Sequence, residues 1–85
     1  MQTFTPTVNG HEIEISASRW SGKERVVYDG EVVSEKRNMS TFATTHIFDR
    51  EESGEKVTYE VNFVSGLFGA GYVLRRNGIA MACEP

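Results

Sequence analysis

The side chains able to act as nucleophiles, bases or metal ligands are few in this chain of 85 residues. The strongest candidates are two histidines, His11 and His46, and one thiol, Cys83. A structural zinc site takes four Cys or His ligands, so these three residues are too few to build one. A catalytic zinc takes fewer, but the sequence has no HExxH or similarly compact ligand spacing. We therefore predict no metal site and no cofactor.

Covalent catalysis has equally little support. Cys83 lies two residues from the end of the sequence, where chains often fray, and we expect it to be a small core residue facing Tyr72. The glycines at 66, 69 and 71 reverse the spacing of a dinucleotide fingerprint. The sequence thus predicts a protein that is not an enzyme. The alternative is a small-ligand binder or minor hydrolase that uses His46 or His11 in a pocket between strands.

Two loops are candidates for binding. Residues 18–23 and 65–71 each place a large aromatic residue among small, flexible residues. Exposed aromatic side chains typically mark an interaction patch. The candidate binding residues are Arg19, Trp20, Lys23, Leu67 and Phe68. The competing interpretation is that Trp20 and Phe68 fold inward and close the ends of the domain.

Four turn dipeptides mark the ends of the predicted strands. Asn9-Gly10, Asp29-Gly30 and Asn77-Gly78 are typical of two-residue type I′ hairpins, and Ser53-Gly54 indicates a looser fourth turn. Pairing across the first turn separates an apolar row from a polar row. This pairing sets Val8 opposite His11, Thr7 opposite Glu12, Pro6 opposite Ile13 and Phe4 opposite Ile15.

The other two hairpins give further expectations. Across Asn77-Gly78, Leu74 is expected opposite Met81, Tyr72 opposite Cys83, and Arg75 opposite Ala80. Across Asp29-Gly30, Val27 is expected opposite Val32 and Val26 opposite Val33. Because both faces of that hairpin are then apolar, we expect it to be deeply placed.

These hairpins predict an all-β fold. Residues 42–48 and 57–63 alternate as two more strands, and no stretch keeps helical spacing over three turns. We expect one domain over residues 1–85, an antiparallel β-sandwich or flattened barrel of about eight short strands joined mostly by hairpins. No internal repeat is visible. Glu51, Glu52 and Glu55 are expected to form a charged turn tip, and Pro6 places the first strand at a sheet edge or bulge.

The overall charge argues against two classes of partner. Twelve acidic and nine basic residues give a net charge of −3, which offers no general attraction to nucleic acid or to anionic lipid. Basic residues at 23, 25, 36, 37, 75 and 76 could gather into one patch near Trp20, but acidic neighbours at 24, 31 and 35 offset much of its field. The longest uncharged stretch, residues 61–74, is shorter than a membrane helix, and the first residues do not resemble a secretory signal. We expect a cytoplasmic protein that binds neither nucleic acid nor membranes.

The order of these motifs resembles the Fas apoptotic inhibitory molecule family. The matching stretches are His11-Glu12-Ile13-Glu14, Ser21-Gly22-Lys23 followed by Val26-Val27-Tyr28-Asp29-Gly30, Ser65-Gly66 before Tyr72, and Asn77-Gly78. The resemblance implies a compact antiparallel β-sandwich module with no catalytic residues. The animal proteins of that family carry two such modules, whereas this chain supplies one.

Together these observations predict a non-catalytic binding or protein-interaction module. A protein partner, or self-association through the edge strand that contains Pro6, is the expected form of binding.

Overall fold

A computed structural model describes residues 2–18, 21–37, 43–66 and 69–84 of the chain. The described residues form nine strands in two antiparallel sheets, and no helix occurs among them. The all-β fold expected from the sequence is confirmed. The chain divides into two compact units, Met1–Thr41 and Phe42–Pro85, each of which contains one sheet.

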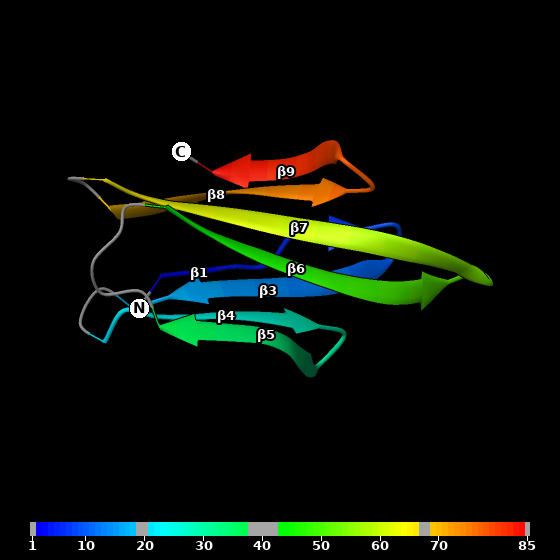
Figure 1. Ribbon diagram of the computed structural model, residues 1–85, viewed down its shortest axis with the longest axis horizontal. Helices are drawn as coiled ribbons and strands as arrows, with labels where there is room; N and C mark the ends of the chain where they lie inside the picture. The colour runs from blue at the N-terminus through cyan, green and yellow to red at the C-terminus, as the bar shows by residue number, and fades with distance from the viewer. Residues whose placement is uncertain (1, 19–20, 38–42, 67–68, 85) are drawn as a thin grey trace. The chain divides into compact units, whose positions relative to one another are not determined.

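The first sheet follows the order β1-β3-β4-β5, and β2 also pairs with β3 (Figure 1). Its strands are β1 (Gln2–Phe4), β2 (Thr7–Val8), β3 (His11–Ala17), β4 (Lys23–Tyr28) and β5 (Glu31–Arg37). Pro6 lies between β1 and β2, which confirms its predicted place at a sheet edge. The predicted pairs Val8–His11 and Phe4–Ile15 are confirmed.

The second sheet follows the order β6-β7-β8-β9, so that every strand pairs with its neighbour in sequence (Figure 1). Its strands are β6 (Ala43–Glu52), β7 (Glu55–Gly66), β8 (Gly69–Arg76) and β9 (Ile79–Glu84). The hairpin of β6 and β7 is regular from Ala43–Val64 to Glu52–Glu55. Because side chains alternate between the faces of a strand, His46, Phe48 and Glu52 share one face.

The four two-residue turns within the described part of the chain have the same backbone conformation. Both residues of each turn have positive φ angles, as a type I′ turn requires. The turns are Asn9-Gly10, Asp29-Gly30, Ser53-Gly54 and Asn77-Gly78. The turn at Ser53-Gly54 is therefore as tight as the others, and the expected looser turn is wrong. The direct pairing of Glu52 with Glu55 leaves only two residues to close it.

Two bulges alter the predicted pairing. Beyond Val27–Val32 the register shifts, and Val26 pairs with Ser34 instead of Val33. Beyond Arg75–Ala80 it shifts in the same way, and Leu74 pairs with Ala82 instead of Met81. A bulge inserts one unpaired residue into one strand, so every later pair moves by one position. The expected pair Tyr72–Cys83 is wrong for this reason, since Tyr72 pairs with Glu84.

One face of each sheet supplies the buried core. In the first sheet its largest buried residues include Ile13, Ile15, Val26 and Tyr28, and in the second they include His46, Tyr59, Val61, Phe63 and Leu74. The expected burial of Cys83 is wrong, because Cys83 is exposed, and Met81, expected opposite the buried Leu74, is 43% exposed. The deep placement expected for the Asp29-Gly30 hairpin is also wrong, since most of β5 is exposed at the edge of its sheet.

Candidate functional site

Of the five candidate binding residues, only Lys23 lies within the described part of the chain. Arg19, Trp20, Leu67 and Phe68 lie outside the described residues. Lys23 begins β4 and lines a shallow hollow together with Glu35, Lys36 and Arg37 of β5. Lys23 and Arg37 are direct partners in the β4–β5 register, as are Arg25 and Glu35. Since alternate residues of a strand share a face, the side chains of Lys23, Arg25, Glu35 and Arg37 form one charged surface.

Glu35 is the carboxylate at the centre of this surface. Nε of Arg25 donates a hydrogen bond of 2.8 Å to Oε2 of Glu35, and Nζ of Lys23 lies 3.6 Å from Oε1. The hydrogen bond from Arg25 lowers the pKa of Glu35, and the charges of Lys23 and Arg25 lower it further. Glu35 therefore remains ionised, and its interactions are with Arg25 and Lys23.

The two histidines named by the alternative hypothesis lie in different sheets. Nδ1 of His11 lies 2.7 Å from Oδ2 of Asp29, and its ring stacks on Tyr28 with centroids 5.0 Å apart. His46 is fully buried in β6, with its ring 5.2 Å from that of Phe63 in an edge-on arrangement. His46 is thus packed as a core residue, whereas His11 ties the start of β3 to the Asp29-Gly30 turn.

The described residues contain neither a candidate metal site nor a candidate membrane-spanning helix. No group of three or more His, Cys, Asp or Glu side chains there could hold a metal ion. Within the same residues no helix has the length and apolar character that crossing a membrane requires.

A buried polar network in the second sheet was not expected from the sequence. The hydroxyl of Tyr59 donates a 2.5 Å hydrogen bond to Oε2 of Glu52, and Nη2 of Arg76 lies 2.9 Å from Oε1. Glu52 is only 7% exposed, so its expected place in a charged turn tip is wrong. The alternation of β6 contained the signal, because Glu52 has the same parity as the buried His46 and Phe48.

This network changes the ionisation of its members. Burial and the hydrogen bond to Glu52 raise the pKa of Tyr59 to about 12. The hydrogen bond to Glu52 also raises the pKa of Arg76. Tyr59 therefore stays neutral and Arg76 stays charged at physiological pH. Buried polar groups that satisfy one another's hydrogen bonds in this way typically have a structural role in the core.

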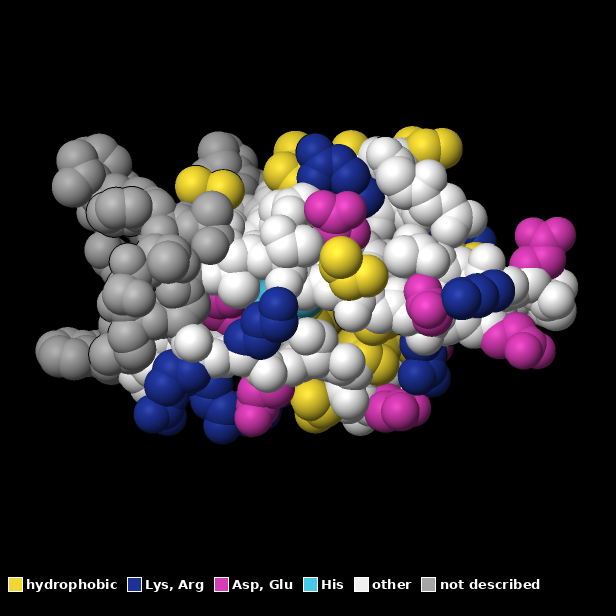
Figure 2. All heavy atoms as spheres, viewed as in Figure 1, with side chains coloured by type: hydrophobic (Ala, Val, Ile, Leu, Met, Phe, Trp, Pro, Cys, Tyr) yellow, Lys and Arg dark blue, Asp and Glu magenta, His cyan; other side chains and the backbone are white. Residues whose placement is uncertain are grey.

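The edge strands of the two sheets differ in chemistry. β5 closes the first sheet and carries Glu31, Glu35, Lys36 and Arg37, whereas residues 79–83 of β9 are all uncharged. Figure 2 shows mainly charged side chains along the margin formed by β5, and several hydrophobic side chains beside basic ones along the margin formed by β9. In β9, Ile79 is 66% exposed, and Ala80, Met81 and Cys83 are also exposed. β9 is therefore an exposed, apolar sheet edge.

The other edges of the two sheets are protected. β1 has only three residues and is followed by Pro6 after one intervening residue. β6 carries Asp49, Arg50 and Glu51. Short length, proline and charged side chains each discourage the addition of another strand. β9 contains no proline, and its one charged residue, Glu84, is the last residue of the strand.

Comparisons with family models, with curated proteins and with solved structures find no match to this chain.

Proposed function

We propose that this protein is a non-catalytic interaction module that associates with a second copy of itself through β9. The observation that carries the proposal is the contrast between β9 and β5. Both strands follow a type I′ turn, both bulge at the same position, and both end their sheet. β5 carries Glu31, Glu35, Lys36 and Arg37, whereas residues 79–83 of β9 are uncharged, so the apolar character of β9 is not a requirement of the backbone.

Strand addition is the form of binding that such an edge supports. An edge strand has unpaired backbone N–H and C=O groups on its outer side, and another extended strand can satisfy them. The exposed side chains of Ile79 and Met81 would also lose contact with water in such a complex. Both contributions favour an extended, uncharged strand as the occupant.

A second β9 meets this description. Antiparallel pairing of two identical strands about a two-fold axis brings no like charges together along residues 79–83. The contact is small because β9 has six residues. We therefore expect weak association, with a Kd on the order of 100 µM.

A matched pair of substitutions tests the proposal. Ala80 pairs with Arg75 next to the last turn, and Val32 pairs with Val27 at the equivalent place in the first sheet. Both residues are exposed, with Val32 at 53%. Ala80→Lys and Val32→Lys thus add the same charge at the same backbone position of different edges. Sedimentation equilibrium from about 20 µM to about 1 mM brackets the expected Kd.

The expected result is that wild-type protein and Val32→Lys dimerise alike, while Ala80→Lys weakens dimerisation by about tenfold or more. A wild-type protein that stays monomeric to the highest concentration would exclude the proposal. Equal weakening by both substitutions would also exclude it, since net charge alone would then control association.

The resemblance to the Fas apoptotic inhibitory molecule family supports the non-catalytic part of the proposal. A role in the cytoplasm and a binding role for the loops that contain Trp20 and Phe68 remain predictions. Hydrolysis or ligand binding at His46 has less support, because this ring is fully buried. A general base must reach its substrate within hydrogen-bonding distance, either directly or through a water molecule.

A further inference from the structure

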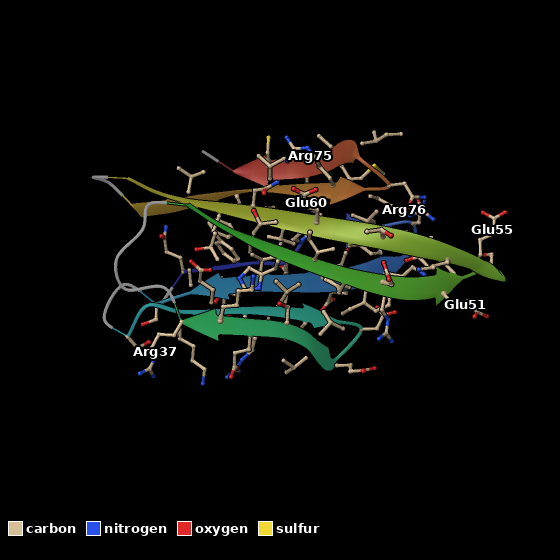
Figure 3. The ribbon with its side chains drawn as sticks, in the orientation of Figure 1. Arg37, Glu51, Glu55, Glu60, Arg75 and Arg76 are labelled. Carbon is tan, nitrogen blue, oxygen red and sulfur yellow. The ribbon has the colours of Figure 1, made fainter. Side chains whose placement is uncertain are left out.

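The first sheet carries a pair of like charges, Lys23 and Arg37, of which only Lys23 makes an ion contact with a carboxylate among the described residues. Lys23 and Arg37 stand directly opposite each other at the open end of the β4–β5 ladder. Like charges in directly opposed positions destabilise a sheet. Within the described part of the chain, Arg37 makes no ion pair and no side-chain hydrogen bond. Its side chain extends outward past the end of β5 (Figure 3).

The remaining charges around the hollow do not cancel this pair. Among the four residues that line the hollow, only Glu35 has a carboxylate, and Nε of Arg25 lies 2.8 Å from its Oε2. The contact from Lys23 to Glu35 is longer, at 3.6 Å. The third basic lining residue, Lys36, lies opposite the buried Glu24 in the register. The hollow thus has a positive excess located at Lys23 and Arg37.

We propose that this hollow binds a phosphate group, with Arg37 and Lys23 as its ligands. The guanidinium of Arg37 can donate two parallel hydrogen bonds to one phosphate, and Lys23 adds a compact positive charge from the facing strand. Lys23 gives up only its longer contact with Glu35 when it turns toward the ligand, because Arg25 keeps that carboxylate paired. A bound anion also relieves the repulsion between Lys23 and Arg37.

The charge of the ligand distinguishes phosphate from simple carboxylates. A phosphate carries close to two negative charges at neutral pH, so it interacts with both cations. A monocarboxylate carries one charge and can neutralise only one of them. The site is exposed, and exposed ion pairs are weak, so we expect a phosphate Kd on the order of 1 to 10 mM.

The test is a titration of the ¹⁵N-labelled full chain, followed by amide chemical shifts at constant ionic strength. The ligands are inorganic phosphate, O-phosphoserine and acetate. The expected result is saturable shifts at residues 23–25 and 35–37 with both phosphates, and much weaker shifts with acetate. Tighter binding of O-phosphoserine would identify phosphate esters as the source, and equal binding would identify free phosphate.

Two arginine variants provide the control. Arg37→Ala should weaken phosphate binding by about threefold or more, because it removes the bidentate donor. Arg75→Ala removes the same charge from the second sheet, where Arg75 pairs with Glu60, and should leave the Kd unchanged. Non-saturable shifts, equal binding of acetate, a wild-type Kd in Arg37→Ala, or equal weakening by both variants would each overturn the proposal.

Discussion

The two sheets share one backbone design at their last turn. Tyr28 pairs with Glu31 and Arg76 with Ile79, and in both strands the bulge falls three residues after the glycine of the turn. The first turn residue makes the same contacts in both sheets. The backbone amide of Glu12 donates to Oδ1 of Asp29, and that of Thr58 donates to Oδ1 of Asn77, each at 2.9 Å. The turn residues therefore set the pairing next to the turn whatever the other side chains are.

Side chains at matched positions differ greatly. Tyr28 in the first sheet stacks on His11, while Arg76 at the same position forms an ion pair with the buried Glu52. The outer faces differ too, as Figure 3 shows for Glu60 and Arg75, which face each other on β7 and β8. The two sheets share a backbone arrangement, so the individual side chains decide whether a strand has a polar core residue, a charged edge or an apolar edge.

The largest effect is expected from removing the cation of the buried network. Arg76→Ala leaves the carboxylate of Glu52 buried without its ion-pair partner, and should lower the free energy of unfolding by about 3 kcal/mol. Urea denaturation measures this loss. Arg75→Ala, at the neighbouring position on the opposite face, should change stability by less than about 0.5 kcal/mol. Equal losses in the two variants would show that the network adds no stability.

A second effect should appear as the pH rises. The pKa of Tyr59 is about 12 in the folded protein against an ordinary value of 10.0, so the unfolded chain loses this proton first. The stabilisation is complete below pH 10 and declines between pH 10 and pH 12, by roughly 2 to 3 kcal/mol in total. The matched residue of the first sheet is Ile13, which does not titrate.

The control for the pH effect is Tyr59→Phe. Urea denaturation at several pH values should show a steeper loss of stability in the wild type than in Tyr59→Phe over this range. Identical slopes would contradict the assignment of the titration to Tyr59.

The smallest effect concerns the turns. Ser53, the first residue of its turn, adopts a φ of 52°. The first residue of each of the other three turns is Asn or Asp. Asn and Asp tolerate this conformation better than Ser, so Ser53→Asn should raise the free energy of unfolding by about 0.5 kcal/mol. Asn9→Ser makes the reverse change in the first sheet and should lower it by a similar amount. Stabilisation by both changes, measured in urea, would contradict this reasoning.

In the two hairpins that contain a bulge, pairing was predicted correctly close to the turn and wrongly beyond the bulge, whereas in the first hairpin the distant pair Phe4–Ile15 was also correct. Val27–Val32 and Arg75–Ala80, two pairs from their turns, were predicted correctly. The next pairs were wrong because each bulge depends on how the strand twists within its sheet, which the turn dipeptide does not specify. The candidate site was predicted only in part. Lys23 does line a hollow, but Arg37 and Glu35 join it through the shifted register.

The sequence by itself determined the strands, the four turns and the rows of inward-facing residues, because turn geometry and alternation are local properties of the chain. Tertiary structure alone decided that Arg76 is the ion-pair partner of Glu52, and that β5 and β9 lie at sheet edges. Those outcomes depend on which strands pair and where the pairing ends. They join residues far apart in the sequence, beyond the reach of any local pattern.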